Sequence, residues 1–206
     1  MSNRFLEKIY SRHCVRKFKN KKVAKKDLAV ITEAGLRAPS SKNSQPWYLL
    51  VVEGKQKEAV AKAVERNFFT RNRVPLSVTG KKIKGMFDST RESIQIIRDV
   101  PALILIFNRQ PYSKGIFELK EIPSRVLTTY GVEIVGIGAC MQNVLLATHA
   151  LGLVAVPIAD IYPGAIDIQK KFKIPYNFVI GIAVGYPDEK TFATKKGKGK
   201  LVKWLN

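Results

Sequence analysis

Apolar and polar residues follow each other along the chain with two different periods, which predict its helices and strands. Apolar residues recur at helical spacing over 27–36, where Asp27 is a suitable N-cap, and again over 91–98. Short apolar runs predict strands at 48–52, 102–107, 154–159 and 178–184, with a short helix at 166–172. The pattern over 67–99 is the least regular. Because the elements do not repeat as strand–helix pairs, they favour an α+β sheet flanked by helices over a doubly wound parallel sheet.

Residues 131–153 form a long apolar run that has the length of a membrane span. It is interrupted by Glu133, Gln142, Asn143, Thr148 and His149, which would be costly in the centre of a bilayer, so a buried helix is expected. Gly136 and Gly138 resemble the start of a dinucleotide fingerprint, but the third glycine is missing and the pair lies inside helical periodicity. We expect these small residues to let another helix approach closely, within the subunit or from a second one.

The stretch 38–47, APSSKNSQPW, is the strongest candidate for a binding site. Its prolines restrict the backbone, and its serine and asparagine side chains can donate and accept hydrogen bonds to a polar, planar ligand. The alternative is a capped turn between the preceding helix and the following strand. A plain turn needs only one proline or glycine, so the composition favours a ligand site.

Composition and length are those of one globular domain that spans residues 1–206, with a basic tail from about residue 190. Hydrophobic residues make up 46% and charged residues 25% of the 206. The net charge of +20 is spread along the whole chain, without a zinc-finger spacing or an aromatic RNA-binding signature. We therefore expect solvated lysine faces and no specific nucleic-acid partner.

Cysteine and histidine are too few for most metal or nucleophilic sites. Cys14 and Cys140 are the two cysteines, and His13 and His149 are the two histidines, far apart in sequence. No metal site and no histidine-based triad is expected. The first residues lack the apolar core of a signal peptide, which predicts a cytoplasmic protein with reduced thiols and no membrane anchor.

Four blocks of the sequence, in this order, resemble the FMN-dependent nitroreductase family over nearly the whole chain. They are RHCVRKF at 12–18, APSSKNSQPW at 38–47, MQNVLLATHALGL at 141–153, and the closing strand with its Gly-Tyr-Pro turn at 179–187. The resemblance implies a mixed, largely antiparallel sheet flanked by helices. It also implies a homodimer with two FMN molecules at the subunit interface, each held by both chains.

The resemblance further implies which residues bind FMN. These are Arg12, His13, Cys14, Arg16, Pro39, Ser40, Ser41, Asn43, Pro157, Ile158, Ala159, Asp160, Lys198 and Lys200. Arg12 and Arg16 are four residues apart and could bind the phosphate from one helical face, while the loop at Pro39 would reach the flavin of the partner subunit. The alternative for Lys198 and Lys200 is a disordered lysine tail. Cys14 stands where the family often has serine, and is either an oxidation-sensitive thiol or a small buried hydrophobe.

The implied reaction needs no catalytic side chain, because the flavin does the chemistry. Hydride would pass from NADH or NADPH through flavin N5 to a nitroaromatic, quinone or similar small-molecule acceptor, in a ping-pong sequence. Two alternatives stay open. One is a specialised flavoprotein of the same fold with a task other than reduction, and the other is a basic binding module that has lost the cofactor.

Overall fold

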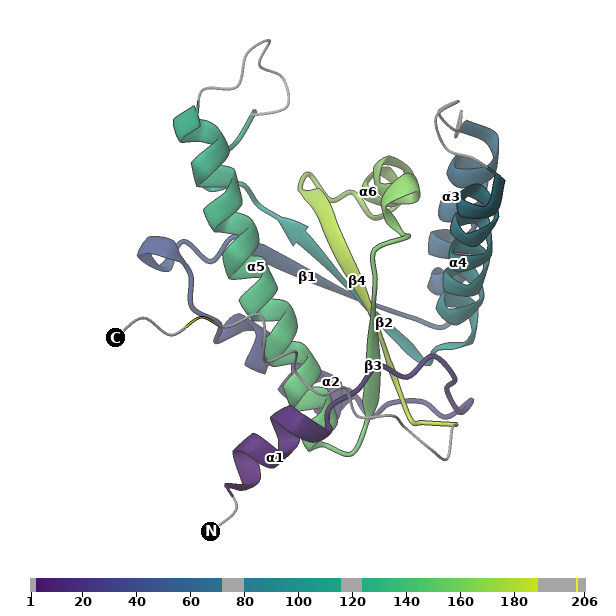
Figure 1. Cartoon of the computed structure of the whole chain (residues 1–206), viewed down its shortest axis with the longest axis horizontal. Helices are drawn as coiled ribbons and strands as arrows, with labels where there is room; N and C mark the ends of the chain where they lie inside the picture. The colour runs from purple at the N-terminus through teal and green to yellow at the C-terminus, as the bar shows by residue number, and fades with distance from the viewer. Residues whose placement is uncertain (1–2, 72–79, 116–123, 189–202, 204–206) are drawn as a thin grey trace.

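Strand β2 (Ala102–Asn108) is the centre of the fold, and all seven of its residues are buried. It pairs on one side with β1 (Trp47–Glu53) and on the other with β4 (Asn177–Gly185), which in turn pairs with β3 (Val154–Ile158). All three pairings are antiparallel, in the order β1-β2-β4-β3. The computed structural model describes residues 3–71, 80–115, 124–188 and 203 (Figure 1).

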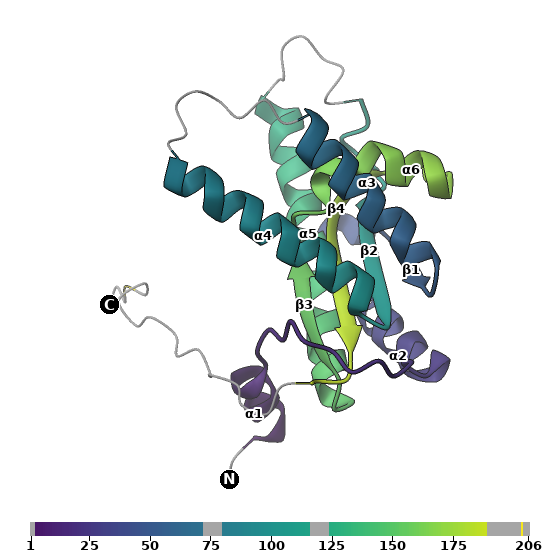
Figure 2. The same ribbon diagram turned by 90° about the vertical axis from the view of Figure 1, so that its right-hand side faces the viewer.

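Alternate side chains of β2 enter two separate hydrophobic cores, as the pleat of a strand requires. Ile104 and Ile106 belong to the core under α2 (Lys25–Leu36) and α5 (Ser124–Ala150). Leu103, Leu105 and Phe107 belong to the other core. That second core lies under three helices, namely α3 (Gln56–Arg71), α4 (Gly80–Asp99) and α6 (Ala165–Phe172). Figure 1 shows α5 and α4 on opposite sides of the sheet, and Figure 2 shows α3 and α4 packed side by side.

Three shorter elements complete the fold. Helix α1 (Arg4–Ser11) buries none of its residues, and its N-cap Asn3 accepts a hydrogen bond from the backbone N–H of Phe5. The turns η1 (Ser41–Asn43) and η3 (Tyr162–Gly164) precede β1 and α6. Helix α1 therefore keeps an apolar face exposed.

The α+β class predicted from the sequence pattern and the largely antiparallel sheet implied by the family resemblance are both confirmed. All four strands and the helix over 166–172 are confirmed within one or two residues of their bounds. Asp27 is not the N-cap of α2, which begins two residues earlier after Ala24. The irregular region 67–99 contains the end of α3 and the whole of one long helix, α4, of which the sequence pattern predicted only the part over 91–98.

Helix α5 is buried on one face only, which is less than the sequence led us to expect. Its inner face packs on α2 and the sheet, whereas Leu127 and Val135 are 57% and 73% exposed. Among the described residues, its span Leu127–Ala150 is the one helix long and apolar enough to cross a membrane by length and composition. A core helix passes the same test, and the buried Glu133 of α5 agrees with that reading.

Gly136 serves a loop and not a second helix of this chain. A Cβ at Gly136 would lie 3.4 Å from Ser40 Cβ and 3.5 Å from Pro46 Cγ. The close approach of two helices depends instead on Gly35 of α2, where a Cβ would lie 2.8 Å from Val144 Cγ2 of α5. The glycine that sequence analysis assigned to helix packing thus supports the Pro39–Pro46 loop.

Replacement of Gly164 by alanine should destabilise the fold. The new Cβ would lie 2.8 Å from the backbone N of Val64 and 2.9 Å from the carbonyl carbon of Ala63. These atoms belong to the backbone of α3, which can move away from the new methyl group only at a cost in free energy. We expect a loss of about 1–3 kcal/mol in the free energy of unfolding, measured by urea denaturation. Gly85→Ala is the matched control, because nothing lies within 4 Å of its Cβ and alanine favours helix, so its stability should stay equal or rise. Equal stability of the two variants would contradict the packing described.

Candidate functional site

The segment after α1 runs extended beside β3. Arg12 is the C-cap of α1 (φ −63°, ψ 129°), and Cys14 then pairs with Ala155 in an isolated parallel bridge. Val15 is fully buried, whereas Cys14 and Arg16 are exposed. The prediction that Arg12 and Arg16 share a helical face is wrong, because the chain leaves the helix to pair with the sheet edge. Residues four apart also share a side of an extended chain, and the Arg12 guanidinium lies 3.9 Å from Cys14 Sγ.

A cavity of about 370 Å³ lies between this segment and α4. It is lined by Cys14, Arg16, Lys17, Glu92, Gln95, Ile96 and Asp99. Arg16 Nε lies 3.7 Å from a carboxylate oxygen of Glu92, and both side chains are more than half exposed. An exposed ion pair of this kind contributes little to stability, so Arg16 can exchange Glu92 for an anionic ligand at small cost.

The residues after β3 are held by α4. Ile158 is buried, Ala159 is exposed, and the carboxylate of Asp160 accepts hydrogen bonds from the hydroxyls of Ser89 (3.1 Å) and Ser93 (2.8 Å). These serines are four residues apart and therefore share one face of α4. Asp160 thus fixes the position of the exposed backbone that directly follows β3.

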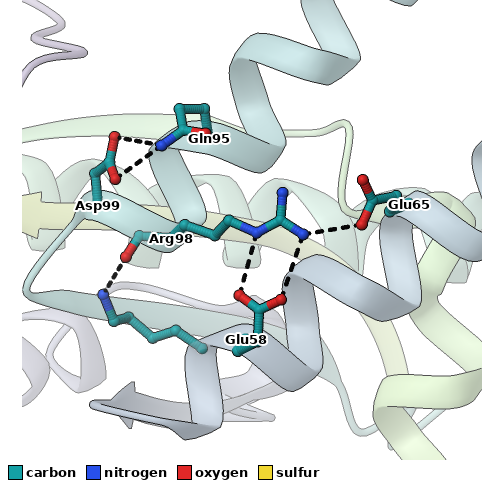
Figure 3. A network of polar contacts seen from close by, with 6 residues as sticks. Glu58, Glu65, Gln95, Arg98 and Asp99 are labelled. Carbon is teal, nitrogen blue, oxygen red and sulfur yellow. Dashed lines mark hydrogen bonds and ion pairs between the residues drawn. The ribbon is translucent and has the colours of Figure 1, made fainter.

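Helix α4 is anchored in turn by a polar network at its C-terminal end. Figure 3 shows Arg98 between two carboxylates of α3, with hydrogen bonds of 3.1 and 3.3 Å to Glu58 and 2.9 Å to Glu65. The hydrogen bond from Arg98 lowers the pKa of Glu58, and the same bond raises the pKa of Arg98. The ammonium of Lys57 donates to the carbonyl oxygens of Arg98 and Val100, and burial lowers the pKa of Lys57. The network sets the position of the helix that supplies Ser89, Glu92 and Ser93.

The loop 38–47 is a fixed turn and also has unusual backbone geometry. Lys42, Asn43 and Gln45 adopt left-handed φ angles of 50°, 51° and 46°. Such angles cost strain at residues other than glycine and persist only where neighbours hold them. Here the Ser40 hydroxyl accepts a hydrogen bond of 3.0 Å from the Gln45 backbone N–H, and the side-chain oxygen Oδ1 of Asn43 accepts one of 3.2 Å from Gln45 Nε2. The exposed side chains of Lys42 and Asn43 are thereby presented from a defined turn.

A buried carboxylate, Glu133 of α5, organises the loop that lies next to this turn. Its oxygens accept hydrogen bonds from the backbone N–H groups of Tyr112 (2.9 Å) and Ser113 (3.1 Å), from the Ser113 hydroxyl and from the Asn108 side chain (2.9 Å). Four donors fill the acceptor positions of one carboxylate. The loop after β2 is therefore tied to α5 without a cation.

The predicted site residues fall into two groups that do not meet in one protomer. The first group surrounds β3 and comprises Arg12, His13, Cys14, Arg16, Pro157, Ile158, Ala159 and Asp160, and the second comprises Pro39, Ser40, Ser41 and Asn43. Val15 and Phe18 contact the core under α4, whereas Ala38 and Trp47 contact the core under α5. The neighbours of the two groups thus belong to different cores, although His13 of the first group lies beside His149 of α5. Lys198 and Lys200 lie outside the described residues.

Several polar residues of this region were not assigned to the site from the sequence. They are Ser89, Glu92, Ser93 and Gln95 of α4 and Glu133 of α5. The available signal was the spacing of Ser89, Glu92 and Ser93, which recurs at three and four residues and marks one face of a helix. Glu133 was noted in the sequence as an interruption of the apolar run at 131–153, but its hydrogen-bonding role was not predicted.

The two histidines lie together at the junction of α1 and α5. Their ring centroids are 6.2 Å apart, and His149 Nε2 lies 2.8 Å from the Ser11 hydroxyl. Burial lowers the pKa of His149, as do the nearby charges of Lys8, His13 and Arg12. Among the described residues no group of three or more histidine, cysteine or acidic side chains could hold a metal ion.

The two cysteines differ in environment. Cys14 is exposed, so the alternative that it is a small buried hydrophobe is wrong. Cys140 of α5 is fully buried, and burial raises the pKa of its thiol to about 12. Cys14 is therefore the thiol within reach of a ligand in the cavity that it lines with Arg16.

Comparison with known proteins agrees with this fold and these motifs. Residues 9–186 match the model of the Nitroreductase family. An iodotyrosine deiodinase from Thermotoga neapolitana is 26% identical over 188 residues, which cover 86% of this chain and 86% of that protein. A nitroreductase from Desulfitobacterium hafniense with bound FMN superimposes with a TM-score of 0.74 at 20% identity, with 100% of both chains covered. The NADPH:FMN oxidoreductase from Vibrio harveyi, solved with NAD⁺, gives a TM-score of 0.71 at 18% identity and covers 99% of this chain and 77% of that one.

The fold, the motif order and the extent of the match place the chain in a class of flavin oxidoreductases built on an antiparallel sheet between two helical layers. The chain belongs to the Nitroreductase family.

Replacement of Glu133 by glutamine should destabilise the protein and loosen the loop after β2. The amide nitrogen of glutamine cannot accept the N–H groups of Tyr112 and Ser113, so at least one buried donor loses its partner. We expect a loss of about 1–3 kcal/mol in unfolding free energy by urea denaturation. Amide hydrogen exchange at Tyr112 and Ser113 should become faster. The matched control, Glu92→Gln on the exposed face of α4, should change stability by less than about 0.5 kcal/mol. An unchanged stability of Glu133→Gln would show that its hydrogen bonds are not needed.

Proposed function

We propose that this protein is a homodimeric FMN-dependent oxidoreductase, which takes electrons from NADH or NADPH and passes them to nitroaromatics, quinones or similar small acceptors. The observation that supports the proposal is the separation of the predicted FMN-binding residues, with Arg16 in a cavity beside α4 and the Ser40 loop beside α5. Neither half encloses a ligand alone. Two protomers that place the loop of one against the Arg16 segment of the other would complete two equivalent sites, as a two-fold dimer requires.

The residues present suit an FMN molecule. Arg12 and Arg16 supply guanidinium donors for a phosphate or a ring carbonyl. The ion pair of Arg16 with Glu92 is long and exposed, so Arg16 can leave it for a ligand at small cost. Glu92 and Asp99 offer carboxylate acceptors in the same cavity, and Ile96 offers an apolar wall. A flavin ring carries carbonyl, N–H and apolar edges, so this donor and acceptor set matches it. We include Lys198 and Lys200 in the proposal as phosphate ligands.

FMN would supply the redox chemistry, accepting hydride from the nicotinamide and delivering electrons to the acceptor. The protein's own residues would bind and orient. Asp160, held by Ser89 and Ser93, positions the backbone around the exposed residue Ala159, where a backbone N–H would donate a hydrogen bond to the cofactor. His13 and Cys14 are expected to contact the cofactor beside Arg12. In a ping-pong sequence the nicotinamide and the acceptor would use the same pocket in turn.

The dimer would also cover the apolar surface that one protomer exposes. Leu127, Val132 and Val135 are exposed along α5, as are Phe5 and Tyr10 of α1. Burial of these side chains against a second chain would stabilise the pair by the hydrophobic effect. We place the reaction in the cytoplasm, where NAD(P)H is available and unpaired thiols such as Cys14 stay reduced.

A second candidate function is a specialised flavoprotein reaction. The relative from Thermotoga neapolitana is named as an iodotyrosine deiodinase, and it covers most of this chain. Purified protein that turns over iodotyrosine but neither nitroaromatics nor quinones would favour this candidate. A protein that cannot be loaded with FMN would favour a basic binding module.

Apo-protein should bind FMN in preference to FAD, and NADH or NADPH should bleach the flavin absorbance under anaerobic conditions. A nitroaromatic or a quinone should then restore it. Arg16→Glu should weaken FMN binding by about tenfold or more, because it places a like charge beside the phosphate or ring oxygens. Lys26→Glu on the exposed side of α2 makes the same charge change away from the site and should leave the dissociation constant unchanged. FAD preference, or equal effects of the two variants, would contradict the proposal.

A further inference from the structure

A second cavity of about 390 Å³ lies beside the η1 turn and α5. Its lining includes Ser41, Lys42, Ser44, Tyr112, Thr128 and Val132. This cavity shares no residue with the cavity at Arg16. It lies next to the turn that the proposed dimer would bring to the partner's flavin, so it would open onto the place where an acceptor enters.

The lining of this cavity combines exposed apolar side chains with hydroxyl groups. Tyr112 is 51% and Val132 40% exposed, and these two side chains offer apolar surface to an aromatic ring. The Thr128 hydroxyl already donates to the Ser124 carbonyl oxygen and keeps acceptor capacity. The lining therefore holds both apolar and polar groups.

Lys42 supplies the positive charge of the cavity. Among the described residues its ammonium has no carboxylate within ion-pair distance. Glu133 also lines the cavity, but its oxygens are occupied by the N–H and O–H groups of Tyr112, Ser113 and Asn108. The one lysine of the lining is thus available to an anionic ligand, while the oxygens of the one carboxylate are already engaged by four hydrogen-bond donors of the protein.

The backbone at Lys42 is fixed, which distinguishes it from a mobile surface lysine. Its left-handed φ of 50° belongs to the turn closed by the hydrogen bond from Gln45 N–H to Ser40 Oγ, and Gly136 of α5 lies directly beneath that turn. A cation on a fixed backbone loses less freedom when it pairs with a ligand and can therefore discriminate between ligands.

We propose that Lys42 makes this cavity selective for acceptors that carry a carboxylate or a similar anionic group, such as nitroaromatic acids. The proposal rests on the proposed function, because it assigns the acceptor of that same flavin site. Tyr112 and Val132 would contact the ring of the acceptor, and Lys42 would contact its charge.

The test compares two acceptors of nearly equal size, the anion 4-nitrobenzoate and the neutral 4-nitrobenzamide, with FMN-loaded protein. The wild type should have the higher kcat/KM for the anion. Lys42→Gln should lower kcat/KM for 4-nitrobenzoate about fivefold while leaving 4-nitrobenzamide unchanged, the size expected of one charge-assisted contact at a partly exposed site. Lys42→Glu should reverse the preference. Equilibrium dialysis should show the same loss of 4-nitrobenzoate binding to the oxidised protein.

Lys114→Gln is the matched control, because Lys114 is exposed in the same loop as Tyr112 and does not line the cavity. It should leave both acceptors unchanged. If Lys42→Gln changes both acceptors equally, or neither, while FMN content and bleaching by NAD(P)H are normal, the inference is wrong and the proposed function stands. If the wild type binds no FMN or reduces neither acceptor, the proposed function fails and the inference fails with it.

Discussion

The complete burial of β2 is the constraint on which the rest of the structure depends. Because both faces of this strand are apolar, the sheet must be covered by helices on both sides, and α4 and α5 come to lie on opposite faces. The Arg16 segment follows the α4 side and the edge of β3, while the loop at Ser40 follows the α5 side. A ligand that contacts both the Arg16 segment and the loop at Ser40 would therefore need one of them from a second protomer.

Polar networks hold the segments beside each half of the proposed site. On the α4 side, Arg98 bridges to α3, and Asp160 accepts hydrogen bonds from two serines of α4. On the α5 side, four donors surround the buried Glu133. Satisfied networks in buried or half-buried surroundings rigidify the groups that they connect. Such rigid surroundings would favour the proposed binding, because less order must be created when a ligand or partner binds.

The strands, the helix over 166–172 and the family motifs could be predicted from the sequence, because they depend on local periodicity and local composition, whereas the bounds of α2, α4 and α5 could not. It could not settle the conformation of the Arg12 to Arg16 segment, since a spacing of four puts two residues on one side of a helix and of an extended chain alike. The pairing of Cys14 with Ala155, which decides between them, joins segments far apart in sequence. The partners of Glu133 and Asp160 escaped for the same reason. Gly136 was correctly noted as a close-packing position, but its neighbour, the Ser40 loop, follows only from the tertiary structure.

The most direct test of the shared site is complementation between two defective chains. Arg16→Glu and Ser41→Glu chains, each with its own affinity tag, should fail to retain FMN as homodimers. In each homodimer the substitution is present in both chains, so both shared sites are altered. A mixed dimer isolated through both tags contains one doubly altered site and one unaltered site, so it should bind about one FMN per two chains and regain bleaching by NAD(P)H. Mixed dimers without FMN would contradict the account, because they would show that Arg16 and Ser41 serve the same site within one chain.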